Sequence, residues 1–187
     1  MFHPIAIVGV VLLAASLLGA VVFDLRSRRI PNRLVLVGIA LALALQALAT
    51  ITGSPALAGR PWWAPLAGLG TGLAVLMPLY LLRATGAGDV KLMAMVGSFI
   101  GAPATLVAAL CTFVAGGLLS LVFMLGRGVA AQALANVRFL LTDLVLRAGS
   151  GQGARLAPLQ ATAARLPYAV AIAVGTAASL FWHPAGF

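Results

Sequence analysis

The sequence predicts an all-α integral membrane protein of about six transmembrane helices, and three observations lead to that class. Hydrophobic residues make up 63% of the 187 residues and charged residues only 8%, and the mean hydropathy is +1.12. Soluble domains carry about 25% charged residues. The apolar residues form runs of about 20, the length of helix that crosses a bilayer, separated by short loops rich in arginine.

The first three spans follow from runs of apolar residues. Residues 5–23 form the first, and arginines follow this run rather than precede it, which is the reverse of a cleaved signal peptide. Residues 24–33 contain Pro31 and four arginines and predict a cytoplasmic loop. Residues 34–51 form the second span. Residues 62–82 form the third, whose two leading tryptophans suit a membrane interface.

The run at 90–126 is too long for one crossing and short for two. Gly101-Ala102-Pro103 is its natural break, and residues 104–125 form the fifth span. About 20 Å of helix separates Asp89 from that break. Either the bilayer is locally thin there, or Asp89 lies below the surface in a protein-lined cavity that water can enter.

One amphipathic helix and a last span complete the predicted fold. Residues 129–146 are predicted to form a cytoplasmic interfacial helix that lies on the membrane. The polar residues near one face of this helix are Gln132, Asn136, Asp143 and Arg147. A glycine-rich loop at 149–153 follows, and residues 166–182 form the last span.

The distribution of positive charge orients these spans. Eleven of the 12 Lys and Arg residues fall on one face of this topology, and only Arg60 falls on the other. By the positive-inside rule the first face is cytoplasmic, so both termini are expected to be extracytoplasmic. The net charge of +9 is thereby explained by topology, and no nucleic-acid partner is expected. The lone Cys111 and the distant His3 and His183 predict neither an internal disulfide nor a metal site.

Two of the three acidic residues are placed to meet. Asp24 ends the first span and Asp89 starts the fourth, both at the cytoplasmic face and at similar depth. Gly86 and Gly88 permit close backbone approach and unusual φ/ψ values beside Asp89. An ordinary helix N-cap is the alternative interpretation of Asp89. Two carboxylates that share a site hold one proton between them and can activate a water molecule.

Three further polar residues are weighed against this pair. Asp143 stands four residues before Arg147, the spacing of a modest ion pair on a surface helix, and is therefore left outside the site. Asn32 and Lys91 are candidates for substrate binding or for support of the site. However, an asparagine after a proline is an ordinary turn residue, and a lysine at the cytoplasmic membrane edge is an ordinary anchor. The structural interpretation of Asn32 and Lys91 is therefore favoured.

Together these residues resemble a known family. Asp24, Arg-Arg-Ile-Pro-Asn at 28–32, Gly-Ala-Gly-Asp-Val-Lys-Leu at 86–92 and Leu-Pro-Tyr at 166–168 are similar to bacterial prepilin peptidases. These enzymes are GxGD membrane aspartyl proteases, and the chain resembles their short Tad/Flp-type form. The resemblance implies a single membrane-embedded peptidase domain over residues 1–187, with Asp24 and Asp89 as the catalytic pair.

The resemblance also implies a substrate and a place in the cell. The substrate would be a prepilin or pseudopilin, cut at the cytoplasmic face of the bacterial inner membrane between a short basic leader and a hydrophobic stalk helix. Larger relatives carry paired CxxC motifs and also N-methylate the new terminus. With one cysteine in the chain, proteolysis without methylation and without a cofactor is expected.

Two alternatives remain open at this point. A non-enzymatic carrier or assembly scaffold could use Asp24 and Asp89 as a proton path, because acids inside membranes mark such paths too. A signal-peptide-peptidase-like protease is the other, but that group has Tyr-Asp in an earlier helix. Phe23-Asp24 followed by an arginine-rich loop fits that pattern poorly.

Overall fold

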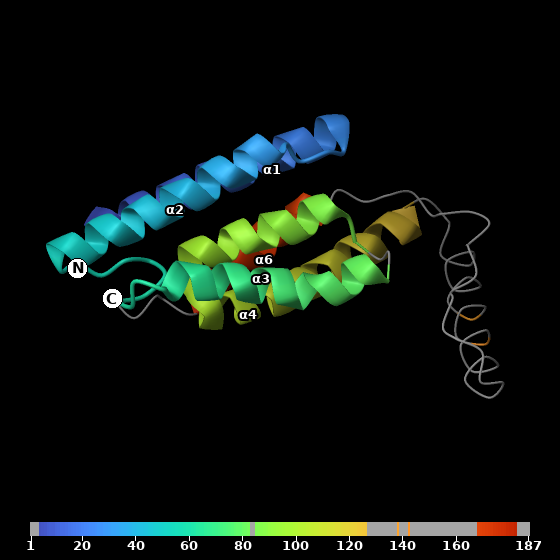
Figure 1. Ribbon diagram of the computed structural model, residues 1–187. Helices are drawn as coiled ribbons and strands as arrows, with labels where there is room; N and C mark the ends of the chain where they lie inside the picture. Colours follow the sequence, from blue (N-terminus) through green and yellow to red (C-terminus); the bar gives the residue numbers. More distant parts are fainter. Residues whose placement is uncertain (1–3, 83–84, 127–137, 139–141, 143–167, 183–187) are drawn as a thin grey trace. The chain divides into compact units, whose positions relative to one another are not determined.

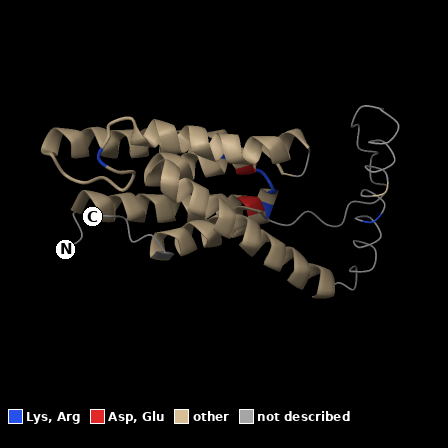
Figure 2. Cartoon of the chain, turned by 90° about the horizontal axis from the view of Figure 1, so that it is seen from below, with Lys and Arg blue, Asp and Glu red and all other residues tan. Residues whose placement is uncertain are grey.

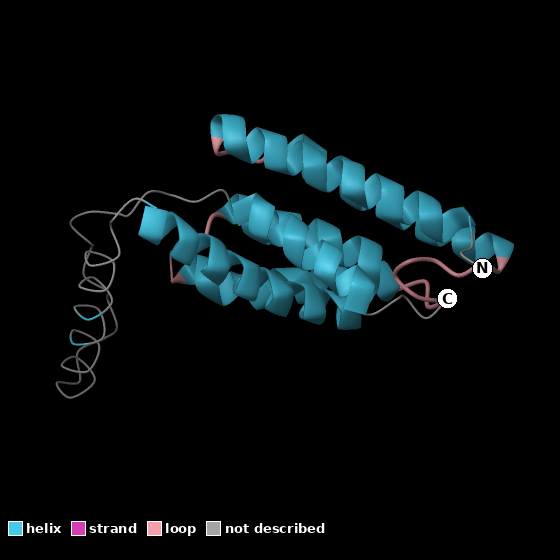
Figure 3. Ribbon diagram, turned by 180° about the vertical axis from the view of Figure 1, so that it is seen from behind, coloured by secondary structure: helices cyan, strands magenta, loops and turns pink. Residues whose placement is uncertain are grey.

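The described part of the chain is helical throughout. The computed structural model describes residues 4–82, 85–126, 138, 142 and 168–182 (Figure 1). Figure 3 shows helices joined by loops and no strand in these residues. The helices are α1 (Pro4–Ser27), α2 (Asn32–Thr52), α3 (Ala64–Leu81), α4 (Ala87–Gly126) and α6 (Tyr168–Trp182). The all-α prediction is confirmed.

Four of these helices, α1 to α4, are long and apolar enough to cross a membrane, and the shorter α6 is apolar as well. Large apolar side chains lie on their outer faces, such as Leu18 and Ile51. Such exposure suits contact with lipid tails and would be unusual in a protein surrounded by water. The protein is therefore a membrane protein. The count of six spans stays a prediction, and the interfacial helix predicted at 129–146 lies outside the described residues except for Arg138 and Thr142.

The chain divides into two compact units, residues 1–116 with 167–187 and residues 117–166. The first unit holds α1, α2, α3, α6 and α4 as far as Gly116, and it contains both candidate acids. Within it α1 contacts α2 and α6, and α2 contacts α3. Of the second unit, the structure describes the end of α4 together with Arg138 and Thr142.

The loop between α1 and α2 is shorter than the sequence predicts. α1 continues to Ser27, so Asp24 lies in a helix rather than in the loop expected at 24–33. The turn comes at Arg28, which has a positive φ of 51°. Its N–H donates to the carbonyl oxygen of Asp24 at 2.9 Å. Pro31 is then the N-cap residue of α2, with φ −64° and ψ 131°, and the fixed φ of proline allows this extended conformation.

α4 folds back on itself at Gly101, where the backbone leaves helical geometry with φ 75° and ψ 171°. A Cβ placed on Gly97 would lie 3.1 Å from Oγ1 of Thr105. In a straight helix eight residues span about 12 Å, so this contact requires the chain to reverse direction between them. The break predicted at residues 101–103 is therefore present, and Gly101 supplies the left-handed φ that the turn needs.

The first half of α4 is the most enclosed helix of the unit. Every residue from 92 to 101 is buried. Its glycines allow α3 to approach to backbone contact, because a Cβ on Gly68 would clash with the carbonyl oxygen of Gly97, and a Cβ on Gly97 with that of Gly68. Gly72 meets the carbonyl oxygen of Met93 in the same way. Small residues at helix interfaces are typical of membrane proteins.

Candidate active site

The Gly-Ala-Gly-Asp motif forms the first turn of α4. Asp89 is the third residue of the helix, and its Oδ2 accepts a hydrogen bond from the backbone N–H of Gly86 at 3.1 Å. The N–H of Asp89 in turn donates to the carbonyl oxygen of Gly86, also at 3.1 Å. This is the return arm of a capping box, in which an acid in the first turn reaches back to the N-cap residue. The N-cap interpretation of Asp89 is therefore wrong by three residues: Gly86 holds that position.

The two glycines of the motif do not adopt the positive φ values that glycine alone adopts easily. Among the described glycines, positive φ values occur at Gly53, Gly59 and Gly101, so Gly86 and Gly88 differ from the sequence-based expectation. Gly88 does provide close approach. A Cβ there would lie 3.5 Å from Cβ of Ile30, in the turn between α1 and α2. The motif is thus packed against the segment that follows Asp24.

Asp24 is held by the last helix. Its side chain is buried near the end of α1, and its Oδ2 accepts a hydrogen bond from the backbone N–H of Ala169 at 3.2 Å. Ala169 is the second residue of α6. The first N–H groups of a helix have no partner within it and carry the positive end of its dipole, which suits a carboxylate. Sequence reasoning missed this contact, and the only signal was Leu-Pro-Tyr ahead of the last span.

The structure brings Asp24 and Asp89 to the same end of the unit. The turn that follows Asp24 packs against Gly88, the residue before Asp89, and Figure 2 shows acidic residues in red in this part of the unit. Their carboxyl groups are close enough for their charges to interact. Within the described part of the chain the two groups share no direct hydrogen bond. Each uses its Oδ2 on a backbone N–H, which leaves Oδ1 of each as the atom that can face water or substrate.

Lys91 and Asn32 contact each other rather than either acid. Nζ of Lys91 donates to Oδ1 of Asn32 at 3.1 Å, and both side chains are exposed. The bond joins the first residue of α2 to the first turns of α4. This geometry supports the structural interpretation, in which the pair fixes the turn beside Gly88 against the helix that carries Asp89.

Breaking that bond is expected to weaken activity modestly. Lys91→Met should lower kcat/KM by about fivefold, since an exposed polar contact contributes about 1 kcal/mol or less. Asn32→Ala should give the same loss, and the double variant should add nothing, because both changes remove one interaction. Arg26→Met is the matched control, as it removes an exposed cation of the same turn region. Additive losses would show that the two residues act separately.

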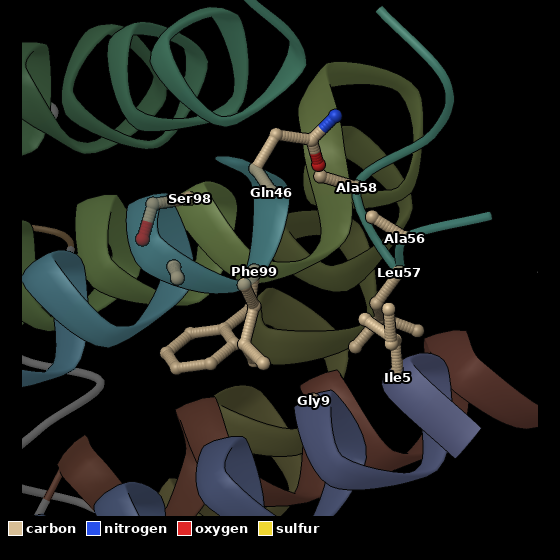
Figure 4. A pocket seen from close by; sticks show the side chains of 10 residues that line it. Ile5, Gly9, Gln46, Ala56, Leu57, Ala58, Ser98 and Phe99 are labelled. Atoms are coloured by element: carbon tan, nitrogen blue, oxygen red, sulfur yellow. The ribbon is translucent and has the colours of Figure 1, made fainter. Parts of the chain in front are cut away.

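A small cavity lies at the other end of the unit (Figure 4). Its lining includes Ile5 and Gly9, and Gly9 is about 22 Å of helix away from Asp24 along α1. Its volume of about 10 Å³ holds about one water molecule, far less than a peptide. Gln46 borders it, with Nε2 donating to the carbonyl oxygens of Gly59 at 3.0 Å and Pro61 at 2.9 Å. These bonds tie the α2–α3 loop to α2 and serve the fold.

Comparison with known proteins agrees with the resemblance. The model of the type IV leader peptidase family matches residues 11–121, more than half of the chain. Nothing matches among the curated proteins or the solved structures. The matched segment contains both acids and the Gly-Ala-Gly-Asp motif, and it ends before α6. The chain therefore belongs to the type IV leader peptidase family and is a membrane-embedded protease.

Proposed function

We propose that this protein is an aspartic-type endopeptidase that removes the leader peptide of prepilins or pseudopilins at the cytoplasmic face of the inner membrane. Asp24 and Asp89 form its catalytic pair. One observation carries the proposal: the turn that follows Asp24 packs against Gly88 beside Asp89, and each carboxyl group accepts a hydrogen bond from a backbone N–H at the start of a helix. Family membership supports the reaction class.

Held in this way, the pair can perform acid–base hydrolysis. Two carboxyl groups in one site retain a single proton between them. The ionised member takes a proton from water as the water oxygen bonds to the scissile carbonyl carbon, while the protonated member donates to the carbonyl oxygen. When the C–N bond breaks, the leaving amine takes the proton that the base removed from water. A hydroxyl group of the intermediate gives its proton to the other carboxylate as the new carboxyl product forms, and the pair regains its starting state. The hydrogen bonds to both Oδ2 atoms fix the carboxyl planes for this exchange.

The family and the surroundings of the pair support a prepilin as substrate. A pilin precursor presents a basic leader to the cytoplasm and a hydrophobic stalk to the membrane. The exposed arginines of the α1–α2 turn suit the cytoplasmic side of the membrane, and the apolar outer faces of the helices suit contact with a hydrophobic stalk. The single cysteine of the chain supports proteolysis without N-methylation.

A cleavage assay with purified components tests this function. The protein in lipid nanodiscs is mixed with a Flp-type prepilin, and the products are identified by mass. One cut between leader and stalk is expected, with an unmethylated new terminus even when S-adenosylmethionine is supplied. A methylated product would overturn the cofactor-free reaction, and an intact prepilin would overturn the peptidase itself.

The distribution of charge predicts the topology of this enzyme. A reporter fused after Phe187 should be active only outside the cytoplasm, whereas one inserted at 149–153 should be active only inside, because 11 of 12 cations then stay on the cytoplasmic side. A reporter inserted in the loop that contains Arg60 is the matched control and should behave like the fusion at the C-terminus. A cytoplasmic C-terminus would mean that the number of spans is odd.

A further inference from the structure

Tyr168 occupies the start of α6 with its ring against α4. It is half-buried, and a Cβ placed on Gly116 would lie 3.0 Å from Cε2 of the ring and 3.5 Å from its hydroxyl oxygen. A side chain at position 116 would therefore press on the ring and require it to shift. The absence of a side chain at Gly116 is what allows the phenol to lie where it does.

The same helix end contacts Asp24 and lies within electrostatic range of Asp89. The residue after Tyr168 donates its N–H to Oδ2 of Asp24. The charge of Asp89 reaches the Tyr168 phenol. The described contacts show no hydrogen bond from this phenol to either carboxyl group. One turn of α6 thus places a backbone donor on one acid and a side-chain donor near the other.

We propose that the Tyr168 hydroxyl donates a hydrogen bond to the scissile carbonyl oxygen and holds it as the tetrahedral intermediate forms. This inference rests on the proposed peptidase function. As the water oxygen bonds to the carbonyl carbon, the π electrons move to the carbonyl oxygen. That oxygen takes the proton of the protonated acid and the hydrogen bond of the phenol, while the ionised acid accepts the proton of water. Fixed donors aimed at developing charge are a large contribution to catalysis.

The chemistry of the site favours a phenol here. Each acid already takes part in proton transfer, one as base and one as acid, so a neutral donor beside them can orient the carbonyl without competing for either role. A tyrosine hydroxyl is neutral near pH 7 and is both a donor and an acceptor. The family match ends at residue 121, so it does not assign this role to Tyr168.

Tyr168→Phe tests the proposal, because it removes the hydroxyl and keeps the ring over Gly116. We expect kcat to fall about 100-fold, the scale seen when one such donor is lost, while KM and the melting temperature in detergent stay unchanged. Tyr80→Phe is the matched control. Tyr80 is the other tyrosine of the chain and is exposed on α3, so its variant should match the wild type.

Gly116→Ala provides a second test that leaves the hydroxyl in place. The added methyl group displaces the ring, so kcat should fall toward the value of Tyr168→Phe, and the double variant should lose no more than Tyr168→Phe alone. Gly70→Ala, where a Cβ meets nothing within 4 Å, controls for the loss of a helical glycine.

Three outcomes would overturn the inference. A wild-type kcat for Tyr168→Phe would exclude the hydroxyl. A loss of kcat that merely follows a lower melting temperature would reduce Tyr168 to a packing residue. A wild-type enzyme that cleaves no prepilin would remove both this inference and the proposed function. If Asp24→Asn and Asp89→Asn are inactive while Tyr168→Phe is normal, the peptidase stands and only the role of Tyr168 fails.

Discussion

Asp24→Asn and Asp89→Asn are each expected to abolish prepilin cleavage, by at least about 10⁴-fold in kcat, as for members of other catalytic units. An amide cannot pass a proton between water and substrate. The fold should survive, since the side-chain oxygen of an asparagine can still accept the N–H of Ala169 at one site and of Gly86 at the other. Cleavage rate and the fraction of correctly inserted protein are measured together.

Asp143→Asn is the matched control for this pair. It removes the remaining acid of the chain, lies outside the described residues, and should keep nearly full activity because its expected role is an exposed ion pair. The double variant Asp24→Asn/Asp89→Asn should be no worse than either single variant. Normal cleavage by either single variant would exclude the dyad and favour the proton-path interpretation. An inactive but folded Asp143→Asn would add a third acid to the site.

Hydropathy predicted the helices that the structure describes. A segment in the bilayer must form its backbone hydrogen bonds internally, as a helix does, and its side chains must suit lipid, so each such helix is visible as an apolar run. The break at Gly101 was also visible, since a glycine followed closely by a proline, here Gly101-Ala102-Pro103, marks a turn even inside an apolar run. Helix ends were less predictable. α1 runs past its apolar stretch to Ser27, and the turn at Arg28 uses a left-handed conformation that its side chain does not signal.

The sequence allowed the two acids of the candidate site to be predicted, but not the groups that hold them. The scarcity of charge made Asp24 and Asp89 conspicuous, and the alternation of spans put them on one face. The partners of these acids could not be read in the same way. Ala169 lies 145 residues from Asp24, and its contribution is a backbone N–H that any residue type could supply. Its role depends on where α6 begins and on its packing against α1, which are properties of the tertiary structure.

The contact between α3 and α4 is where a single methyl group should have the largest effect on folding. Gly97→Ala places a Cβ against the carbonyl group of Gly68, and Gly68→Ala does the reverse. Backbone cannot rotate away as a flexible side chain can, so the helices must separate. Overpacking of this kind costs about 1–3 kcal/mol, occasionally more. Both variants should therefore unfold at lower temperature in detergent.

Gly70→Ala separates this steric effect from the general consequence of replacing glycine. Gly70 lies on α3 between Gly68 and Gly72, yet a Cβ there meets nothing within 4 Å. Alanine favours a helix interior over glycine by about 1 kcal/mol, so Gly70→Ala should be neutral or stabilising while Gly68→Ala is destabilising. The two substitutions are chemically identical and two residues apart, but only Gly68→Ala places a methyl group against the backbone of α4.

Activity should fall with stability at this contact, because the first half of α4 carries Asp89 at its start and packs on α3 along its length. A helix pushed away from α3 also moves Asp89 relative to Asp24, which is anchored to α6. Thermal unfolding and cleavage are measured for all three variants in the same detergent, with cleavage assayed well below each melting temperature. Equal melting temperatures for Gly68→Ala and Gly70→Ala would show that the backbone contact between α3 and α4 does not hold the unit together.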